Sequence, residues 1–208
     1  MGKRDWIMIH KLLKDTKVVL ASASPRRQDL LKMLGLSPLI IPSRVFEQVT
    51  NQPAHIQVIK NAQNKAKSVA KMLDEQSLVI GADTIVVLDR QVLGKPADKQ
   101  EAKAFLRKLS GNTHKVYTGL CLCLNMTCEC AYERSVVEFS ELTDMEIDDY
   151  IDTLEPADKA GAYGIQGYGS QFIKRINGCY FNVMGFPIHL FYSMLKKIYS
   201  SDDATNIR

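Results

Sequence analysis

Long apolar runs and a strong excess of one charge are both missing from this chain of 208 residues. Its longest apolar stretch falls far short of the roughly 18 residues that span a membrane, so we expect no membrane as a partner. Lysine and arginine number 27 against 23 aspartates and glutamates, which gives a net charge of +4. This excess is small and no stripe of basic and aromatic residues accompanies it, so we expect no nucleic acid as a partner either. A polyanionic small molecule fits the same charge equally well.

A continuous apolar leader is also missing. Apolar residues in the first 17 positions are interspersed with Lys, Arg, Asp and His, unlike the apolar core of a secretory signal peptide. A mitochondrial presequence is the alternative, but Asp5 and Asp15 and the lack of serine near them argue against it. We expect residues 1–16 to form a helical extension, residues 17–200 a single domain and residues 201–208 a flexible tail.

Cysteine is present in an odd number, five, and without a recognisable secretion signal. This combination predicts a reducing, cytoplasmic location. Four of the five form two C-x-C pairs, Cys121 with Cys123 and Cys128 with Cys130. Such pairs can bind zinc, but the spacing differs from that of zinc fingers. Alternating residues on both sides of residues 125–126 instead predict a β-hairpin with thiols along one face.

Helical and strand patterns alternate along the chain, but several strands follow one another in its centre. Apolar residues at helical spacing predict helices over Pro25–Leu34, Ala54–Leu73, residues 98–109, residues 143–153 and Pro187–Tyr199. Short apolar or alternating runs predict strands over Thr16–Ala21, Leu39–Pro42, Leu78–Ile80, Ile85–Leu88, Val92–Leu93, Val116–Leu124, Cys128–Phe139 and Phe172–Ile176. This order predicts an α/β fold of the α+β type: an elongated mixed sheet flanked by helices, with two lobes and a central cleft.

The predicted helix that starts at Pro25 carries two arginines in its first turn. Ser24 is a natural N-cap and Pro25 a natural first helical residue. A helix start offers free N–H groups and partial positive charge, so added arginines indicate a site for phosphate or carboxylate. The alternative is a capped helix with two solvated arginines. Adjacent helical residues point about 100° apart, and Arg27 shares its face with Leu31, so we expect Arg26 and Arg27 to differ in role.

Asp83 follows a predicted buried strand, within the run Gly81-Ala-Asp-Thr84. A buried carboxylate is unfavourable unless it is paired or binds a cation, and it can hold Mg²⁺ or accept a proton from water. The alternative is an aspartate that caps a turn. A position at a strand end favours a ligand site over that alternative.

Two loops add further polar groups. Lys95 lies between Gly94 and Pro96 and, taken alone, is typical of a solvated lysine. The glycine-rich run 158–169 contains Gln166, whose amide can read the edge of a base. Its glycines would let the backbone approach a ligand closely. The run matches neither the P-loop nor the dinucleotide-binding fingerprint.

Taken together, these segments resemble the Maf family of nucleoside triphosphate pyrophosphatases. The resemblance extends from Val18 to about Leu195 and rests on Leu20-Ala-Ser-Ala-Ser-Pro-Arg-Arg27, Gly81-Ala-Asp-Thr84, Gly94-Lys-Pro96, Leu109-Ser-Gly111 with His114, Glu155-Pro156, the run from Asp158 to Gly167, and Gly185-Phe-Pro187. It implies a fold similar to inosine triphosphate pyrophosphatase, with a cleft between two lobes, and a homodimer. It also implies hydrolysis of a nucleoside triphosphate to the monophosphate and pyrophosphate, with a divalent cation, Mg²⁺ or Mn²⁺.

The same resemblance assigns roles to individual residues. Asp83 would accept the proton of the attacking water, and Asp83 and Glu47 would hold the metal. The family's usual acidic pair is reduced here to Phe46-Glu47. The residues that would contact phosphates are Ser22, Arg27, Lys65 and Lys95. Three cations and a divalent metal can offset the roughly four negative charges of a triphosphate, as phosphoryl transfer requires. His114 is expected to be structural.

Three positions, Arg26, Thr84 and Gln166, resemble the subgroup that acts on dTTP and UTP. The subgroup that acts on 7-methyl-GTP typically has Trp, Gln and Glu there. The amide of Gln166 can pair a donor and an acceptor with the imide edge of thymine or uracil. We therefore predict a pyrimidine nucleotide, standard or modified, as substrate. The alternatives are a pyrophosphatase for 7-methyl-GTP or another modified purine, and a non-catalytic, nucleotide-binding regulator of cell division. Retention of Asp83 and Lys95 argues against the last.

Overall fold

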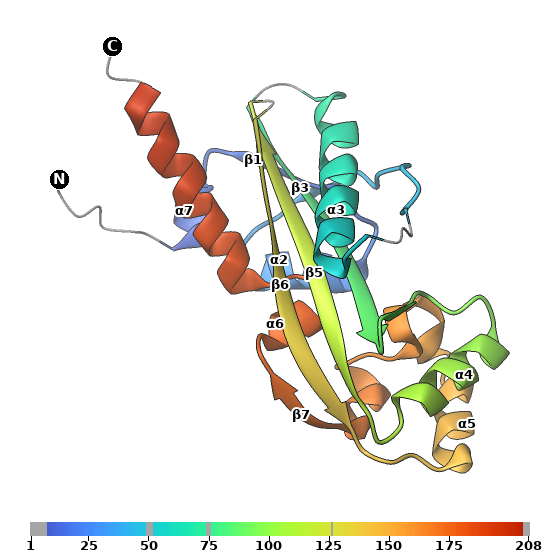
Figure 1. Cartoon of the computed structure of the whole chain (residues 1–208). Coiled ribbons are helices and arrows are strands. Elements are labelled where there is room, and N and C mark those ends of the chain that lie inside the picture. Colours follow the sequence, from blue (N-terminus) through green and yellow to red (C-terminus); the bar gives the residue numbers. More distant parts are fainter. Residues whose placement is uncertain (1–7, 49–51, 74–75, 126, 206–208) are drawn as a thin grey trace.

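The computed structural model describes residues 8–48, 52–73, 76–125 and 127–205 (Figure 1). Its helices are α1 (Ile9–Leu12), α2 (Pro25–Met33), α3 (Ala54–Ala70), α4 (Lys99–Leu109), α5 (Asp144–Asp152), α6 (Tyr180–Val183) and α7 (Ile188–Thr205). Its strands are β1 (Lys17–Leu20), β2 (Leu39–Ile40), β3 (Ser77–Leu88), β4 (Gln91–Leu93), β5 (Thr113–Leu124), β6 (Thr127–Phe139) and β7 (Ile173–Asn177). Short 3₁₀ turns at Glu155–Asp158, Ala160–Ala162 and Gly167–Phe172 form the segment between α5 and β7. None of the helices described is long and apolar enough to cross a membrane.

The strands form one mixed sheet in the order β2-β1-β3-β5-β6-β7, and β4 pairs with β3 beside this path. β1 is parallel to both of its neighbours, β2 and β3, whereas the pairs β3–β5, β5–β6 and β6–β7 are antiparallel. The long strands β5 and β6 run from beside α3 to the level of β7, and β3 accompanies them for most of that length (Figure 1). The prediction of an elongated mixed sheet flanked by helices is confirmed.

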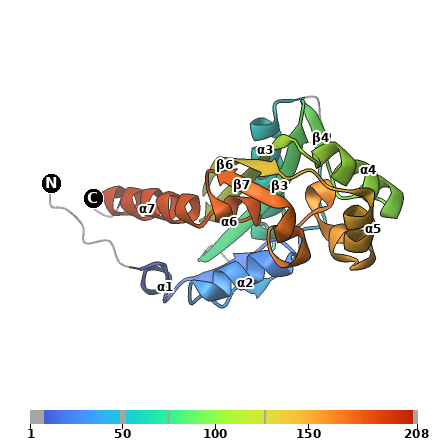
Figure 2. The ribbon, with the colours of Figure 1, turned by 90° about the horizontal axis from the view of Figure 1, so that it is seen from below.

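Alternating residues of the central strands face two different helical layers. Leu78 and Ile80 of β3 point towards α2 and α7, where they join an apolar core with residues of both helices. Val79, between them, points towards α3 and packs with Ala62 and Ala66. Figure 2 shows α2 and α3 on opposite sides of the strands. This period-2 alternation is what a sheet covered on both faces requires.

Helix α3 lies directly on the strands because two glycines, one on β3 and one on β5, make room for it. A Cβ on Gly81 would lie 2.1 Å from the carbonyl oxygen of Ala62, and a Cβ on Gly119 would lie 2.3 Å from that of Val58. Neither position can hold a larger residue without moving the helix. The close approach fixes the height of α3 above the middle of β3.

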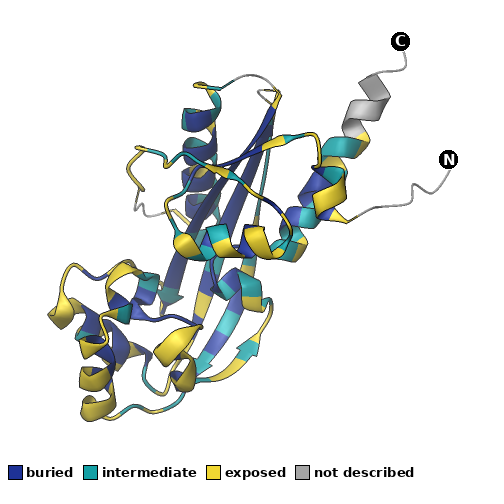
Figure 3. Cartoon of the chain, turned by 180° about the vertical axis from the view of Figure 1, so that it is seen from behind, coloured by how far each residue is buried: buried dark blue, intermediate teal, exposed yellow. Residues whose placement is uncertain are grey.

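A second core fills the other end of the long strands. Val86 and Val116 pack there against α4 and α5, through side chains such as Leu106 and Tyr150. His114 lies in this core as a structural residue: its Nε2 contacts the hydroxyl of Tyr163 at 2.7 Å, and burial lowers the pKa of His114 to about 4. The two cores define the two lobes, and Figure 3 shows the buried strands continuing through both.

The structure corrects the predicted course of β3. Sequence patterns predicted a strand at Leu78–Ile80 and a separate hairpin strand at Ile85–Leu88, whereas β3 runs unbroken over Ser77–Leu88. Its residues 79–87 pair with residues 123–115 of β5. This pairing includes Asp83, which lies opposite Gly119. Asp83 is therefore in mid-strand, and the alternative of an aspartate capping a turn is wrong.

Differences at the two ends of the chain are smaller. α7 continues to Thr205, beyond the end predicted at Tyr199, so helix reaches into the predicted tail at 201–208. The predicted N-terminal helix is confirmed only over Ile9–Leu12, and residues 1–7 and 206–208 lie outside the described residues. Ser24 occupies the N-cap position of α2, but its side chain makes no capping hydrogen bond. The division into extension, domain and tail stays a prediction.

Candidate active site

A gap in strand pairing creates the candidate site. On one edge of β3, β1 pairs as far as Ile80, whose carbonyl accepts the N–H of Ala21 at 2.8 Å. β4 pairs with β3 only from Val86 onwards. Among the described strands none covers residues 82–85 on this edge. Loops that follow β1, β2 and β4 surround the gap, and a cavity of about 640 Å³ opens over it.

All nine residues predicted to bind substrate or metal or to act in catalysis line this one cavity. They come from six separate parts of the chain: Ser22, Arg26, Arg27, Glu47, Lys65, Asp83, Thr84, Lys95 and Gln166. Lys95 and Gln166 are exposed on its rim, and Asp83 lies on its floor at 2% exposure. The structure therefore brings the predicted site residues together, while the individual roles assigned to them stay predictions.

Lys65 connects the two acidic residues of the site. From α3, its ammonium group donates to Oδ1 of Asp83 at 2.7 Å, to Oε1 of Glu47 at 2.6 Å and to the carbonyl of Ala82 at 3.2 Å. All three of its N–H bonds are thus in use. Asp83 and Lys65 are buried, whereas the Glu47 side chain is 51% exposed. Burial raises the pKa of Glu47, but Lys65, helped by more distant cations, outweighs it and lowers that pKa.

Asn61 belongs to the same network and was missed in the sequence. Its amide donates to Oδ2 of Asp83 at 3.0 Å, and it exchanges two hydrogen bonds with the backbone of Gln48, at 3.1 and 3.2 Å. Asp83 is therefore held at both oxygens. The signal was present as a polar stripe: Gln57, Asn61 and Lys65 recur every four residues on α3 and are all buried. Buried polar residues at helical spacing need partners, which here lie in the cavity.

Arg27 faces the opposite side of β3 and binds the protein itself. Its guanidinium donates to the carbonyls of Gly185 at 2.9 Å and Ala82 at 3.0 Å, and to the hydroxyls of Ser22 at 2.9 Å and Thr84 at 3.1 Å. Four of its five N–H groups are occupied, which leaves one on Nη2. Burial lowers the pKa of Arg27, and the charges of Asp83 and Glu47 act against this shift.

The Thr84 hydroxyl forms one link of a directed chain of hydrogen bonds. Thr118 donates its only hydroxyl proton to the carbonyl of Asn182 at 3.0 Å. The 3.0 Å contact between Thr84 and Thr118 is therefore donated by Thr84. The Thr84 proton is thus committed to Thr118. One lone pair of its oxygen accepts from Arg27, so only the other lone pair is open to the cavity.

Arg26 takes a different path from Arg27, as the helical geometry predicted. It is half-buried and pairs with Asp158 at 3.2 Å. Lys159 donates to the same carboxylate at 2.8 Å and to the backbone carbonyl of Glu155 at 2.6 Å. Burial raises the pKa of Asp158, but these two cations outweigh it and lower that pKa. The alternative of two solvated arginines is wrong for Arg27, which is 9% exposed.

The glycine-rich loop is organised around Glu155. Its carboxylate accepts from the hydroxyl of Tyr150 at 2.9 Å and from the N–H groups of Tyr168 at 2.8 Å and Gly169 at 3.2 Å. Gly167 has a φ of +78°, and a Cβ there would lie 2.4 Å from Glu155. The sequence predicted that these glycines bring the backbone close to a ligand. At Gly167 the close neighbour is Glu155 instead, and this packing presents Gln166 at the cavity rim.

The oxygen atoms around Lys65 fit a divalent cation. Mg²⁺ is usually held by one or two carboxylates, with water and substrate phosphates completing its octahedron. Asp83 and Glu47 provide two carboxylates on one lysine ammonium group. A divalent cation is positively charged like the Lys65 ammonium group, so the same two carboxylates can bind it. No third Asp, Glu, His or Cys joins them among the described residues, so substrate oxygens would have to complete the coordination.

Comparison with known proteins agrees with the sequence motifs. The family described as Maf-like protein matches residues 17–198. The dTTP/UTP pyrophosphatase of Bacillus cytotoxicus is 48% identical over 183 residues, which cover 87% of this chain and 95% of that protein. The dTTP/UTP pyrophosphatase of Thermoanaerobacter sp. strain X514 is 46% identical, over 87% of this chain and 96% of that protein.

A solved structure, the Ham1 protein of Staphylococcus aureus, aligns over 87% of this chain and 98% of that chain, with 13% identity and a TM-score of 0.49. At this score the similarity to inosine triphosphate pyrophosphatase stays a prediction. The family match and the relatives each cover most of the chain, and on that ground the chain belongs to the Maf family.

Proposed function

We propose that this protein hydrolyses nucleoside triphosphates, with dTTP and UTP preferred, to the monophosphate and pyrophosphate. The relatives with 46–48% identity carry that activity in their names. The observation that carries the proposal is Asp83, a buried carboxylate fixed at both oxygens on the floor of a cavity lined by five cations: Arg26, Arg27, Lys65, Lys95 and Lys159. Hydrolysis of a phosphoanhydride needs positioned charge more than covalent chemistry.

Asp83 is the proposed general base. Lys65 and Asn61 fix its carboxylate, so a water beside it would meet an acceptor of defined orientation. A nucleophilic serine or cysteine is not needed. Positioning of this kind supplies a large part of the barrier reduction in reactions where water attacks a bound phosphate.

Lys65, Lys95, Ser22 and the remaining N–H of Arg27 are the proposed phosphate contacts. Lys65 must exchange one of its present partners for a phosphate oxygen, and Glu47 is the exposed one among them. A divalent cation, Mg²⁺ or Mn²⁺, held by Asp83 and Glu47 would offset charge on the phosphates and polarise a phosphoryl oxygen.

Arg26, Thr84 and Gln166 are the proposed base-selecting residues. Gln166 is exposed at the rim, where its amide can meet the imide edge of a pyrimidine. Thr84 can only accept from a ligand, because its proton is committed to Thr118. A cytoplasmic location and a homodimer are proposed on the family resemblance alone.

The test is a panel of nucleoside triphosphates, including dTTP, UTP and 7-methyl-GTP, incubated with the protein and Mg²⁺. Pyrophosphate and orthophosphate are assayed separately. We expect pyrophosphate, formed fastest from dTTP and UTP. Release of orthophosphate alone would exclude cleavage between the α and β phosphates. Fastest turnover of 7-methyl-GTP would replace the pyrimidine assignment, and binding without turnover would make the protein a nucleotide sensor.

A further inference from the structure

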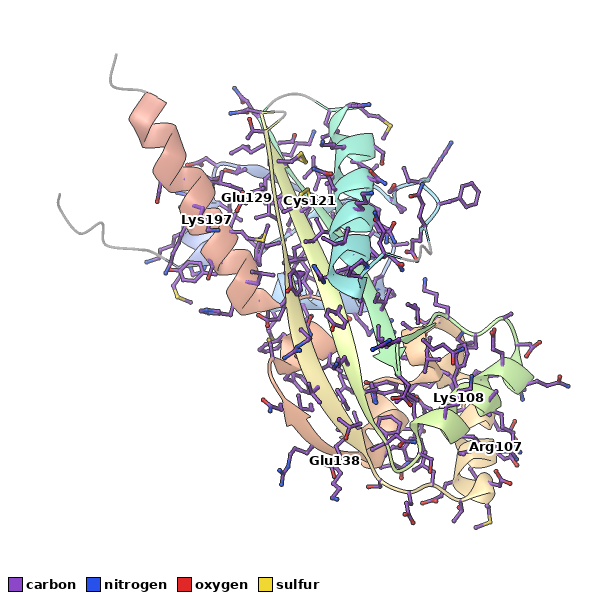
Figure 4. All side chains as sticks on the ribbon, viewed as in Figure 1. Arg107, Lys108, Cys121, Glu129, Glu138 and Lys197 are labelled. Carbon is purple, nitrogen blue, oxygen red and sulfur yellow. A yellow bond between two sulfur atoms is a disulfide. The ribbon has the colours of Figure 1, made fainter. Side chains whose placement is uncertain are left out.

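Four cysteines gather at the end of the β5–β6 hairpin, away from α4 and α5. Cys121 lies opposite Cys130, and Cys123 opposite Cys128, in the register of the two strands. Residues two apart on a strand share a face, so all four side chains point the same way. Figure 4 labels Cys121 beside α3. The structure joins each opposite pair in a disulfide and leaves Cys179 free.

The arrangement suits disulfides better than a metal. A tetrahedral zinc needs four sulfurs about 2.3 Å from one point, which brings every pair to a similar separation. Here the Cα atoms of the opposite pairs are 4.2 and 4.1 Å apart, and the sulfurs of each pair are bonded. The neighbouring sulfurs of Cys121 and Cys123 are 3.9 Å apart. The sulfurs of Cys121, Cys123 and Cys128 lie within 4.8 Å of one another and could reach one ion, but a metal needs free thiolates, and each of these sulfurs is bonded to its opposite partner.

We propose that these four cysteines form a redox site in which two disulfides are reversibly reduced to four thiols by a dithiol protein or small dithiol. This inference is independent of the proposed hydrolase activity. Disulfides in a reducing compartment are usually catalytic or redox-sensing rather than structural. A site of that kind needs one accessible sulfur in each pair, and the hairpin provides it.

Exposure decides which sulfur is attacked. Cys121 and Cys123 on β5 are buried, at 0% and 1% exposure. Cys128 and Cys130 on β6 are only partly buried. A reductant thiolate attacks the Cys128 sulfur, the bond between Cys123 and Cys128 breaks, and Cys123 leaves as a thiolate. The second thiol of the reductant then attacks the mixed disulfide, which releases Cys128 and oxidises the reductant. The two thiolates take up two protons.

The inner pair is reduced through its own partly buried sulfur. A second dithiol attacks the Cys130 sulfur, the bond between Cys121 and Cys130 breaks, and Cys121 leaves as a thiolate. The second thiol of that reductant then attacks the mixed disulfide and releases Cys130, so four thiols result from two dithiols. The Cys121 and Cys123 sulfurs, 3.9 Å apart, are both buried, so neither is a point of attack for the reductant.

The site borders the helix that carries Lys65 and Asn61. Cys121 and Cys123 pack in one apolar cluster with Ala62, Ala66 and Val69 of α3. Formation of the disulfides restricts the hairpin in the unfolded chain and cross-links the strand layer below α3. We therefore expect the oxidised protein to melt at a higher temperature than the reduced one.

The test counts thiols on the full-length protein as a function of redox poise. The protein is equilibrated in mixtures of reduced and oxidised dithiothreitol, quenched in acid, alkylated and weighed intact. We expect one alkylated thiol, Cys179, at the oxidising end and five at the reducing end, with about 4 Da separating the unalkylated forms. The transition should reverse when the mixture is reversed, and peptide mapping should recover the pairs 121–130 and 123–128.

Two variants sharpen the count. Cys179→Ser is the matched control and should lower the number by one in both states without moving the transition. Cys123→Ser should leave one disulfide, 121–130, and a free thiol at Cys128. The oxidised variant should then have two alkylated thiols, Cys128 and Cys179. Five alkylated thiols in every mixture, different pairings, or zinc retained in a one-to-one ratio by the reduced protein would each overturn the proposal.

Discussion

The side chains on the two faces of β3 form two different hydrogen-bond networks in one cavity. On the face towards α3, Asp83 meets Lys65, whose third partner is the half-exposed Glu47. On the face towards α2, Arg27 is enclosed by protein acceptors and passes its hydrogen bond on through Thr84 and Thr118. The first network has a partner that can exchange with a ligand. In the second network, four of the five N–H groups of Arg27 are bound to protein acceptors. Its main effect is therefore to hold the shape of the site.

Replacing Asp83 should give the largest effect on turnover. Asp83→Asn removes the proposed base, and loss of a general base typically lowers the rate by 10²- to 10⁴-fold; we expect about 10³-fold in kcat for dTTP. Steady-state kinetics measure it, with thermal melting to verify that the variant is folded at the assay temperature. Near-normal kcat would remove Asp83 from the chemistry.

Replacing Arg27 should mainly lower stability. Arg27→Met leaves the Gly185 carbonyl without its buried donor and the Ala82 carbonyl with Lys65 as its other donor, and we expect the free energy of unfolding to fall by about 3 kcal/mol. Arg26→Met is the matched control: its half-exposed pair with Asp158 predicts a loss below about 1 kcal/mol. Urea unfolding of both variants distinguishes them, and equal losses would contradict a structural role for Arg27.

Asn61 should act through Asp83 as a positioning residue. Asn61→Ala removes the hydrogen bond to one carboxylate oxygen of Asp83 and the side-chain hydrogen bonds that hold the Gln48 backbone. We expect kcat to fall about 10- to 100-fold, while KM for dTTP changes little, because misplacement of a reacting group acts on the chemical step. Asn61→Gln, which keeps the amide on a longer chain, should restore part of the rate. A change confined to KM would show that Asn61 acts on binding instead.

Replacing Glu47 should give the smallest effect, a loss of stability that depends on pH. The pKa of Glu47 is lowered in the folded state, mainly by Lys65 acting against burial. Its contribution to stability is therefore present above the unfolded pKa, near 4.5, and is lost as the pH falls through the lower folded pKa. The melting temperature of the protein should exceed that of Glu47→Gln at neutral pH, and the two should converge as the pH falls through the lowered pKa of Glu47. A constant difference across this range would exclude an ionised Glu47 as the cause.

Sequence patterns and the family resemblance located most of the fold and nine polar or charged residues that line the cavity. The helix predicted over residues 143–153 begins at a capping box, in which Thr143 and Glu146 exchange hydrogen bonds, and Gly35, with a φ of +76°, follows the helix predicted over Pro25–Leu34. These are local signals. The unbroken course of β3 was not predicted because Gly81 and Ala82 have weak strand propensity, and their extended form depends on pairing with β5 and on contact with α3.

The roles of single side chains were harder to predict than their location. Nothing in the sequence distinguishes an arginine that binds phosphate from one that binds Gly185 and Ala82, because these acceptors are backbone carbonyls far along the chain. Asn61 was missed for a related reason: its partner Asp83 is brought to it only by the packing of α3 on the sheet. The adjacent arginines, in contrast, diverge as helical geometry requires.

Adjacent residues on β3 provide the most direct test of the difference between its two faces. Asp83→Asn and Thr84→Val change neighbours that point to opposite sides, and kcat is compared at saturating dTTP for both. We predict a loss of about 10³-fold for Asp83→Asn and less than about 10-fold for Thr84→Val, which removes a support of Arg27 and a proposed contact to the base but leaves Asp83 in place. Similar losses in both variants, or a greater loss in Thr84→Val, would contradict the assignment of chemistry to the α3 face.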